Sequence, residues 1–234
     1  MALNGLTAAF RASVEGCGGT VTSTAPGSLA DTLAALVRDD GLVLVSDRVP
    51  GARAGRPARG VASSPATFGD IGALRQRGVD ARLGTAAALT GADGDTVSAD
   101  QAFRGAGAAV TGALLGIASS GTVAIAPCGG NDGLLSSLAP HHVAVLRDQD
   151  IVADLGAAFV RLGEVFAETG GEFVLVTGPS RTADIEMMTV LGVHGPLRLD
   201  VVVVSDGTDR ASDPAPTAVG VGSTPHDASA GGQS

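Results

Sequence analysis

The stretch GPSRTADIEMMTVLGVHGP, residues 178–196, lies between two apolar runs, FVLV at 173–176 and LDVVVV at 199–204. Short, Val-rich apolar runs predict buried strands, and the Gly-Pro-Ser sequence after the first run predicts a turn. We interpret the stretch as a turn, a short helix and a second turn that carries His194. Hydroxyl, carboxylate and imidazole groups are thus concentrated at strand ends, where open α/β sheets bind ligands.

Helical and strand patterns alternate along the rest of the chain. Strand patterns cover 42–45, 79–83, 122–126 and 143–146, and helical patterns cover 1–16, 28–39, 70–77, about 99 or 105 to 118, 134–138 and 151–166. The last of these helices carries one apolar stripe, formed by Val152, Leu155, Phe159, Leu162 and Phe166. Because the strands are short and continuously apolar, we expect an α/β fold with a mainly parallel sheet and helices on both faces.

Residues 1–204 are expected to form a single domain. Residues 205–234 have no periodicity and are rich in Gly, Pro, Ser and Asp, which predicts a disordered tail in which His226 is inert.

Composition excludes several kinds of chemistry. All 15 basic residues are Arg, so a Schiff base on lysine and a Walker A loop are both excluded. A formal charge of −9 argues against a nucleic-acid partner. The two cysteines, Cys17 and Cys128, are too few for an iron–sulfur cluster or a structural zinc site. No signal peptide or membrane-spanning run is visible, so we expect a cytoplasmic protein without membrane insertion.

The turn at Gly178 and Ser180, followed by Thr182, is a candidate anion site. Unpaired N–H groups at a helix start favour an anion, and glycine permits close approach of the backbone. The alternative is that Ser180 or Thr182 only caps the helix.

Asp184, Glu186 and His194 are the candidate catalytic residues. On a regular helix the two acids point about 200° apart, so they do not act as a pair. Asp184 falls within an apolar arc, where it either stabilises the turn or has a perturbed pKa. His194 lies between glycines in a tight turn, as a ligand contact or a structural residue.

Other polar residues give weaker signals. His141 and His142 are neighbours at a strand start and face opposite ways, so a metal centre is unsupported. The loops at 119–122 and 127–133 are small-residue candidates for ligand contact, and Cys128 has no evident activating partner. Arg53, Arg56 and Arg59 recur every third residue in a Gly/Pro-rich segment, as a phosphate site or a solvated loop.

Residues 178–186 and 192–196 resemble the C-terminal signature of the LUD-domain family, and 118–122 and 137–145 are more loosely similar to two further segments of it. The resemblance spans about residues 97–204. It implies a three-layer α/β/α fold like that of the sugar-phosphate isomerases, CoA transferases and formyltetrahydrofolate cyclo-ligases. The ligand-binding positions that it implies are Gly121, Thr122, His142, Gly178, Ser180, Thr182 and Gly195.

The chain departs from the family pattern at three places. Leu114 and Ser119 stand where the family often has acidic residues, and Asp132 stands near a position that is often basic. Chemistry of the CoA-transferase type needs a glutamate nucleophile, and Ser119 occupies the nearest position. These differences argue against an inherited catalytic role.

The resemblance implies an accessory component of a system that oxidises L-lactate to pyruvate with iron–sulfur redox partner proteins. We expect it to have no cofactor of its own and to bind a small anionic ligand. The alternative is a stand-alone enzyme acting on a phosphorylated or CoA-linked substrate, with Asp184, Glu186 and His194 as acid–base groups. The sequence leaves homo-oligomer formation open.

Overall fold

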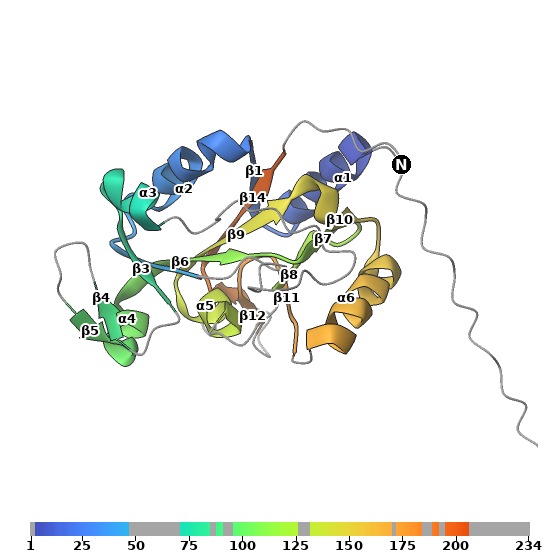
Figure 1. Ribbon diagram of the computed structural model, residues 1–234. Coiled ribbons are helices and arrows are strands. Elements are labelled where there is room, and N and C mark those ends of the chain that lie inside the picture. Colours follow the sequence, from blue (N-terminus) through green and yellow to red (C-terminus); the bar gives the residue numbers. More distant parts are fainter. Residues whose placement is uncertain are drawn as a thin grey trace, which may run out of the picture.

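The computed structural model describes residues 3–46, 71–84, 88–90, 96–125, 132–169, 172–183, 189–191 and 195–205. These residues form a six-stranded sheet, a second sheet of four strands, two short hairpins and helices on both sides of the larger sheet (Figure 1). The predicted α/β fold with a mainly parallel sheet and helices on both faces is confirmed. No helix in this part of the chain is long and apolar enough to cross a membrane.

All pairings in the larger sheet are parallel. Its strands, in spatial order, are β1 (Thr20–Thr24), β14 (Arg198–Val204), β9 (His141–Arg147), β6 (Ala106–Gly112), β2 (Leu42–Val45) and β3 (Asp80–Leu83). The central strands are continuously buried, as expected for a parallel sheet that is covered on both faces.

Helices α2 (Leu29–Val37) and α3 (Ile71–Gln76) cover one face of this sheet, and they lie side by side in Figure 1. Ser28 precedes α2 and makes no side-chain capping bond, and a short 3-10 turn at Pro26–Ser28 leads into the helix. Leu33, Val37 and Leu74 pack against Val residues of the sheet in one apolar cluster. This face therefore has a purely structural core.

The opposite face is covered by α1 (Leu3–Gly16), by the smaller sheet and by two short helices, α4 (Ala99–Gly105) and α5 (Asp132–Leu138). The smaller sheet runs in the order β10 (Ile151–Val152), β7 (Leu115–Ile117), β8 (Thr122–Ile125) and β11 (Val174–Thr177). Helix α6 (Leu155–Thr169) packs on the outer side of the smaller sheet through Ala158, Leu162 and Val165. A 3-10 turn (Asp148–Asp150) connects β9 to β10.

The helix expected from about 99 or 105 to 118 is wrong beyond Gly105. Only α4 is helical, and β6 and β7 follow it. The sequence of β6, AGAAVTG, consists mostly of small residues that have little intrinsic preference for strands. Burial between β9 and β2 decides its conformation, because strand formation depends more on the surroundings than helix formation does.

The short helix expected after Ser180 is also wrong where the chain is described. Residues Arg181–Ala183 form β12, which pairs antiparallel with β13 (Thr189–Leu191). Three of the six paired residues, Thr182, Thr189 and Val190, are β-branched and favour strands. Asp184 and Glu186, which were expected on opposite sides of this helix, lie outside the described residues. A second hairpin, β4 (Ala88–Thr90) with β5 (Thr96–Ser98), and the edge strand β1 were not predicted.

Several predicted features lie outside the described residues. They are Arg53, Arg56, Arg59, Cys128 and residues 206–234 of the predicted tail.

Gly107 in β6 gives a test of this packing. A Cβ atom at this position would overlap the backbone carbonyl of Asp40, whereas one at Gly105 would meet nothing within 4 Å. We expect Gly107→Ala to lower the free energy of unfolding by at least about 1 kcal/mol, because β6 or the segment at Asp40 must move to make room for the methyl group. Urea unfolding followed by circular dichroism measures this, and Gly105→Ala serves as the matched control. Equal stability of both variants would contradict the close approach.

Candidate functional site

A cavity of about 550 Å³ opens beside the first part of the signature stretch. Its walls come from the end of α1, the C-terminal half of α5, strand β11 with the turn that leads into β12, and the segment before β14. The lining residues are Gly16, Cys17, Ser136, Ser137, Val174, Leu175, Val176, Thr177, Gly178, Pro179, Ser180, Arg181, Gly195 and Pro196. Ligand pockets in proteins typically measure about 300–1,000 Å³, so the cavity has the size of a ligand site.

Two glycines let the backbone segments around the cavity come together. Gly178 has a φ of +67°, and a Cβ there would lie 2.5 Å from the carbonyl oxygen of Cys17. A Cβ on Gly195 would lie 3.0 Å from that of Ser180, and the Ser180 N–H donates to the carbonyl of Pro196 at 2.8 Å. The turn after β11 is therefore fixed between the end of α1 and the entry into β14.

Three of the predicted ligand-binding residues, Gly178, Ser180 and Gly195, lie together in this wall. Thr122 lies directly behind it, because its hydroxyl is 2.7 Å from that of the lining residue Thr177. Gly121 has a φ of +65° and approaches the backbone of α1 at Val14, so its role is to form the turn before β8.

The remaining predicted site residues are placed differently. Thr182 lies in β12, one residue beyond the lining residue Arg181, and its side chain is not among those described. Asp184, Glu186 and His194 lie outside the described residues. Leu114 packs on α6, and Ser119 donates its backbone N–H to the carbonyl of Ala153.

His142 is buried in the core instead of lining the cavity. It is fully buried, and its Nε2 lies 2.8 Å from the hydroxyl of Thr111. Its Nδ1 has no hydrogen-bond partner. Burial, with a contribution from the charge of His141, lowers the pKa of His142 to about 3, so the ring is neutral at physiological pH.

Cys17, Ser136, Ser137 and Arg181 are cavity residues that sequence reasoning did not select. Among the described lining residues Arg181 is the single charged one, and its guanidinium donates to the carbonyl of Cys17. The lining hydroxyls come from Ser136, Ser137, Thr177 and Ser180. A guanidinium beside several hydroxyls is suited to binding an anion.

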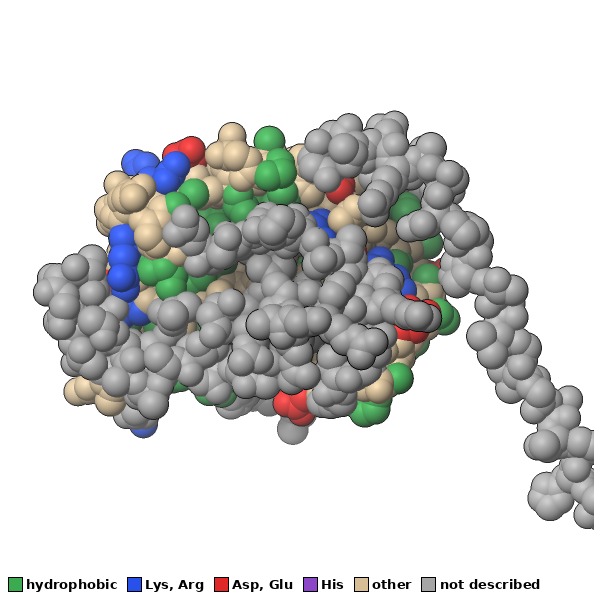
Figure 2. Space-filling model, in the orientation of Figure 1, with side chains coloured by type: hydrophobic (Ala, Val, Ile, Leu, Met, Phe, Trp, Pro, Cys, Tyr) green, Lys and Arg blue, Asp and Glu red, His purple; other side chains and the backbone are tan. Residues whose placement is uncertain are grey.

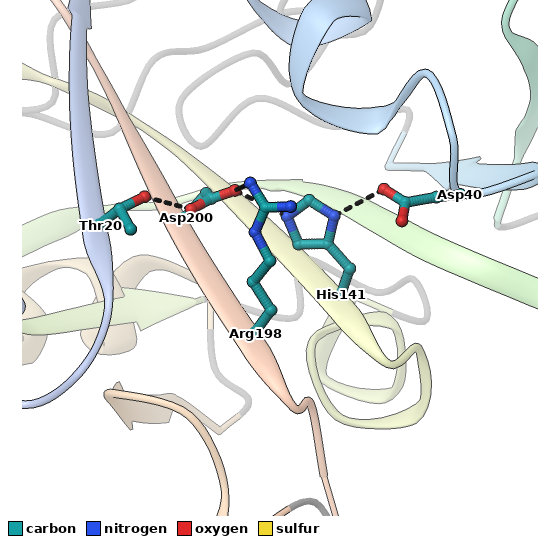
Figure 3. Close-up of polar contacts among 5 residues, drawn as sticks. All are labelled: Thr20, Asp40, His141, Arg198 and Asp200. Atoms are coloured by element: carbon teal, nitrogen blue, oxygen red, sulfur yellow. Dashed lines mark hydrogen bonds and ion pairs between the residues drawn. The ribbon is translucent and has the colours of Figure 1, made fainter.

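A second polar cluster lies at the amino end of the larger sheet (Figure 3). His141, the first residue of β9, lies between two carboxylates: its Nδ1 is 2.6 Å from Asp40 and its Nε2 is 2.9 Å from Asp200. Asp200 of β14 also accepts from the hydroxyl of Thr20 and pairs with Arg198 at 2.6 Å. Because carboxylates occupy both ring nitrogens, His141 has no lone pair for a metal or a substrate proton. We assign the cluster a structural role.

The charges of this cluster stabilise one another. Burial alone would lower the pKa of His141, but hydrogen bonds and charges from Asp200 and Asp40 outweigh it and raise the pKa above 6.5. Burial would raise the pKa of Asp200, but hydrogen bonds from His141 and Thr20 and the charges of Arg198 and His141 hold it below 3.8. Sequence reasoning missed Asp200, although a carboxylate inside the run LDVVVV requires buried partners and was the available signal.

The cluster predicts how stability depends on pH. The raised pKa of His141 stabilises the fold fully below pH 6.5, and this contribution is lost as pH rises through the folded-state pKa. The lowered pKa of Asp200 stabilises it fully above pH 3.8, and this contribution is lost as pH falls through its folded-state pKa. The contribution of the pair is therefore greatest between these two values.

We expect His141→Gln to lower the free energy of unfolding by about 1–3 kcal/mol near pH 5.5, because the buried Asp200 keeps Thr20 and Arg198 but loses its charged hydrogen bond from His141. The difference from wild type should shrink as pH rises toward 9. Urea unfolding at a series of pH values measures it. A difference that is constant between pH 5.5 and pH 9 would show that His141 is not charged in the fold.

Comparisons with known proteins support the fold and the signature. A family model described as the LUD domain matches residues 10–204. Lactate utilization protein C of Shouchella clausii is 34% identical over 92 residues, covering 38% of this chain and 40% of the relative. The protein of the same name from Deinococcus radiodurans is 34% identical over 100 residues, covering 42% of this chain and 47% of the relative. The matched segment thus spans less than half the length of these curated relatives.

A solved structure shares the fold. It is the crystal structure of a DUF162 family protein from Deinococcus radiodurans at 1.70 Å resolution, with a TM-score of 0.56 and 20% sequence identity. The match covers 87% of this chain and 99% of that one.

Proposed function

Because the chain belongs to the LUD-domain family, we propose that it is a cytoplasmic accessory component of an L-lactate utilization system. The assignment to lactate utilization is supported by relatives that carry the name lactate utilization protein C, in Shouchella and Deinococcus among others. In this proposal the chain works with iron–sulfur redox partner proteins that carry out the electron transfer, while it contributes binding and assembly.

The cavity beside Ser180 supports a binding role, and this is the observation that carries the proposal. Its described wall offers hydroxyls, a guanidinium, the thiol of Cys17 and apolar side chains. The hydroxyls and the guanidinium are suited to hold and orient an anion. We infer that a small anionic ligand binds here, with Arg181 opposite its charge and the hydroxyls of Ser180, Ser137 and Thr177 as hydrogen-bond partners.

The ligand is tested by thermal shift with L-lactate, pyruvate and inorganic phosphate as probes. A ligand at 100 times its Kd stabilises the folded protein by about 2.7 kcal/mol, which is a readily measured rise in Tm. We expect a carboxylate probe to raise the Tm of the wild type. In Arg181→Gln the same probe should cause little or no rise in Tm. Arg11→Gln is the matched control, because Arg11 also donates to a backbone carbonyl, that of Val21, but lies outside the cavity wall.

The same screen includes phosphosugars and acyl-CoAs. If only a phosphosugar or an acyl-CoA stabilises the wild type, and Asp184→Ala and His194→Ala abolish this stabilisation, the chain is better explained as a stand-alone enzyme. No effect of any probe would overturn the ligand site.

The role in lactate utilization is tested in cells. Deletion of the gene should abolish growth on L-lactate as the sole carbon source and leave growth on glucose unchanged, and the tagged protein should co-purify with iron–sulfur proteins. Complementation by His194→Ala at the wild-type rate would support an accessory role over a catalytic one. Normal growth on lactate after deletion, together with no co-purifying iron–sulfur protein, would refute the proposal.

A further inference from the structure

Helix α6 has more apolar surface than the smaller sheet covers. At about 100° per residue, Ala158, Leu162 and Val165 occupy one arc and face the sheet. Leu155, Phe159 and Phe166 occupy the adjoining arc of about 40° and are 48%, 58% and 51% exposed. The helix predicted from residue 151 begins at Leu155, so Val152 of the predicted stripe lies in β10 instead. Of the other members, Leu162 faces the sheet and the three exposed ones face away from it. In the region where Figure 1 places α6, Figure 2 shows green hydrophobic groups next to red acidic ones.

This exposed surface continues to the edge of the smaller sheet. The ring of Phe166 lies 6.2 Å, between centroids, from that of Phe173, which also packs against the α6 core. Leu175, two residues further along an extended segment, lies on the same face as Phe173 and is 42% exposed. We call Leu155, Phe159, Phe166, Phe173 and Leu175 together the α6 patch.

The α6 patch reaches the ligand cavity. Leu175 lines that cavity, and it lies on β11, which is the edge strand of the smaller sheet. A protein bound on the patch would therefore stand beside the cavity mouth. This continuity joins the two surfaces into one region of the molecule.

The two ends of the patch carry acidic residues. Asp154 directly precedes Leu155, Glu172 directly precedes Phe173, and both acidic residues are exposed. The basic residue of α6, Arg161, is engaged with the buried Asp150 at 3.0 Å. A second copy of this chain, with a formal charge of −9, would bring like charges together around the patch. The charge pattern favours a different protein, with an apolar centre surrounded by Lys and Arg.

We propose that the α6 patch is the docking surface for a protein partner whose contact surface is apolar and rimmed by basic residues. The inference rests on the proposed function, and it specifies the face of the chain to which the partner binds. Soluble monomers rarely leave a contiguous apolar surface of this kind exposed, and aromatic side chains such as Phe159 and Phe166 are typical anchors of interfaces.

The test uses the full chain and the iron–sulfur proteins that co-purify with it. We expect the double variant Phe159→Gln/Phe166→Gln to bind them at least about tenfold more weakly than wild type, since truncation of anchor residues at the centre of an interface typically costs at least that factor. Val160→Gln is the matched control: Val160 is 51% exposed on the same helix but lies about 100° from Phe159, so its change should leave affinity within about twofold. Gln is a good helix former, so α6 itself is retained.

Charge is tested separately. Glu172→Lys should weaken binding of a basic-rimmed partner, and added salt should weaken the wild-type complex. Glu164→Lys is the matched control, because Glu164 is also exposed but lies about 200° around α6 from Phe166, on the side away from the patch. Equal weakening by both charge reversals would show that only the overall charge matters and would contradict the acidic edge of the patch. The single variant Phe159→Gln replaces the double variant if the latter shows a lowered Tm.

The outcomes separate the two proposals. If the wild type binds no iron–sulfur protein, the partner part of the proposed function fails and the docking surface fails with it. If a complex forms and the patch variants bind as tightly as wild type, only the docking surface is overturned. A wild-type homodimer that becomes monomeric in the variants would also overturn it, because the occupant would then be a second copy.

Discussion

The carboxylate of Asp200 lies inside a parallel sheet with 1% of its surface exposed. An ionised carboxylate in such a position costs several kcal/mol unless it is paired and hydrogen-bonded. Thr20 on one neighbouring strand and His141 on the other supply these bonds, and Arg198 supplies a further charge. His141 in turn reaches Asp40, just before β2 (Figure 3). One buried charge therefore ties together the amino ends of β1, β14 and β9 and the loop before β2.

The cavity beside Ser180 depends on this arrangement. The N–H groups of Leu197 and Arg198 donate to the carbonyl of Pro140, at 2.7 and 3.1 Å, which fixes the entry into β14 beside the start of β9. Pro196, one residue earlier, lines the cavity and accepts the hydrogen bond from Ser180. The cavity thus lies at the amino end of β14, whereas open α/β sheets usually bind ligands at the carboxyl ends of their parallel strands. One wall of the cavity comes from β11, which belongs to the smaller, mixed sheet and pairs antiparallel with β8, so the rule for parallel strands does not apply to it.

If the proposed function holds, the same organisation leaves room for both a ligand and a partner. The face with α2 and α3 is closed by an aliphatic core. The face with the smaller sheet ends at the edge strand β11. Residues of β11 line the cavity, and one of them, Leu175, also belongs to the α6 patch. The cavity and the α6 patch are therefore adjacent, and a molecule bound at one would lie beside the other.

Sequence by itself determined the class of fold, most of the buried strands and the location of the signature stretch, because continuous runs such as VVVV can only be buried and the family motif is long. It also brought Gly178, Ser180 and Gly195 together as site residues. Only the tertiary structure decided that AGAAVTG is a central strand and that residues 181–183 pair with 189–191, since small or three-residue segments have no periodicity strong enough to fix their conformation. It likewise decided that Asp200, His141 and Asp40 form one network. These residues are distant in the chain, and their charges acquire partners only when the parallel register places Asp200 beside Thr20 and Arg198 beside His141.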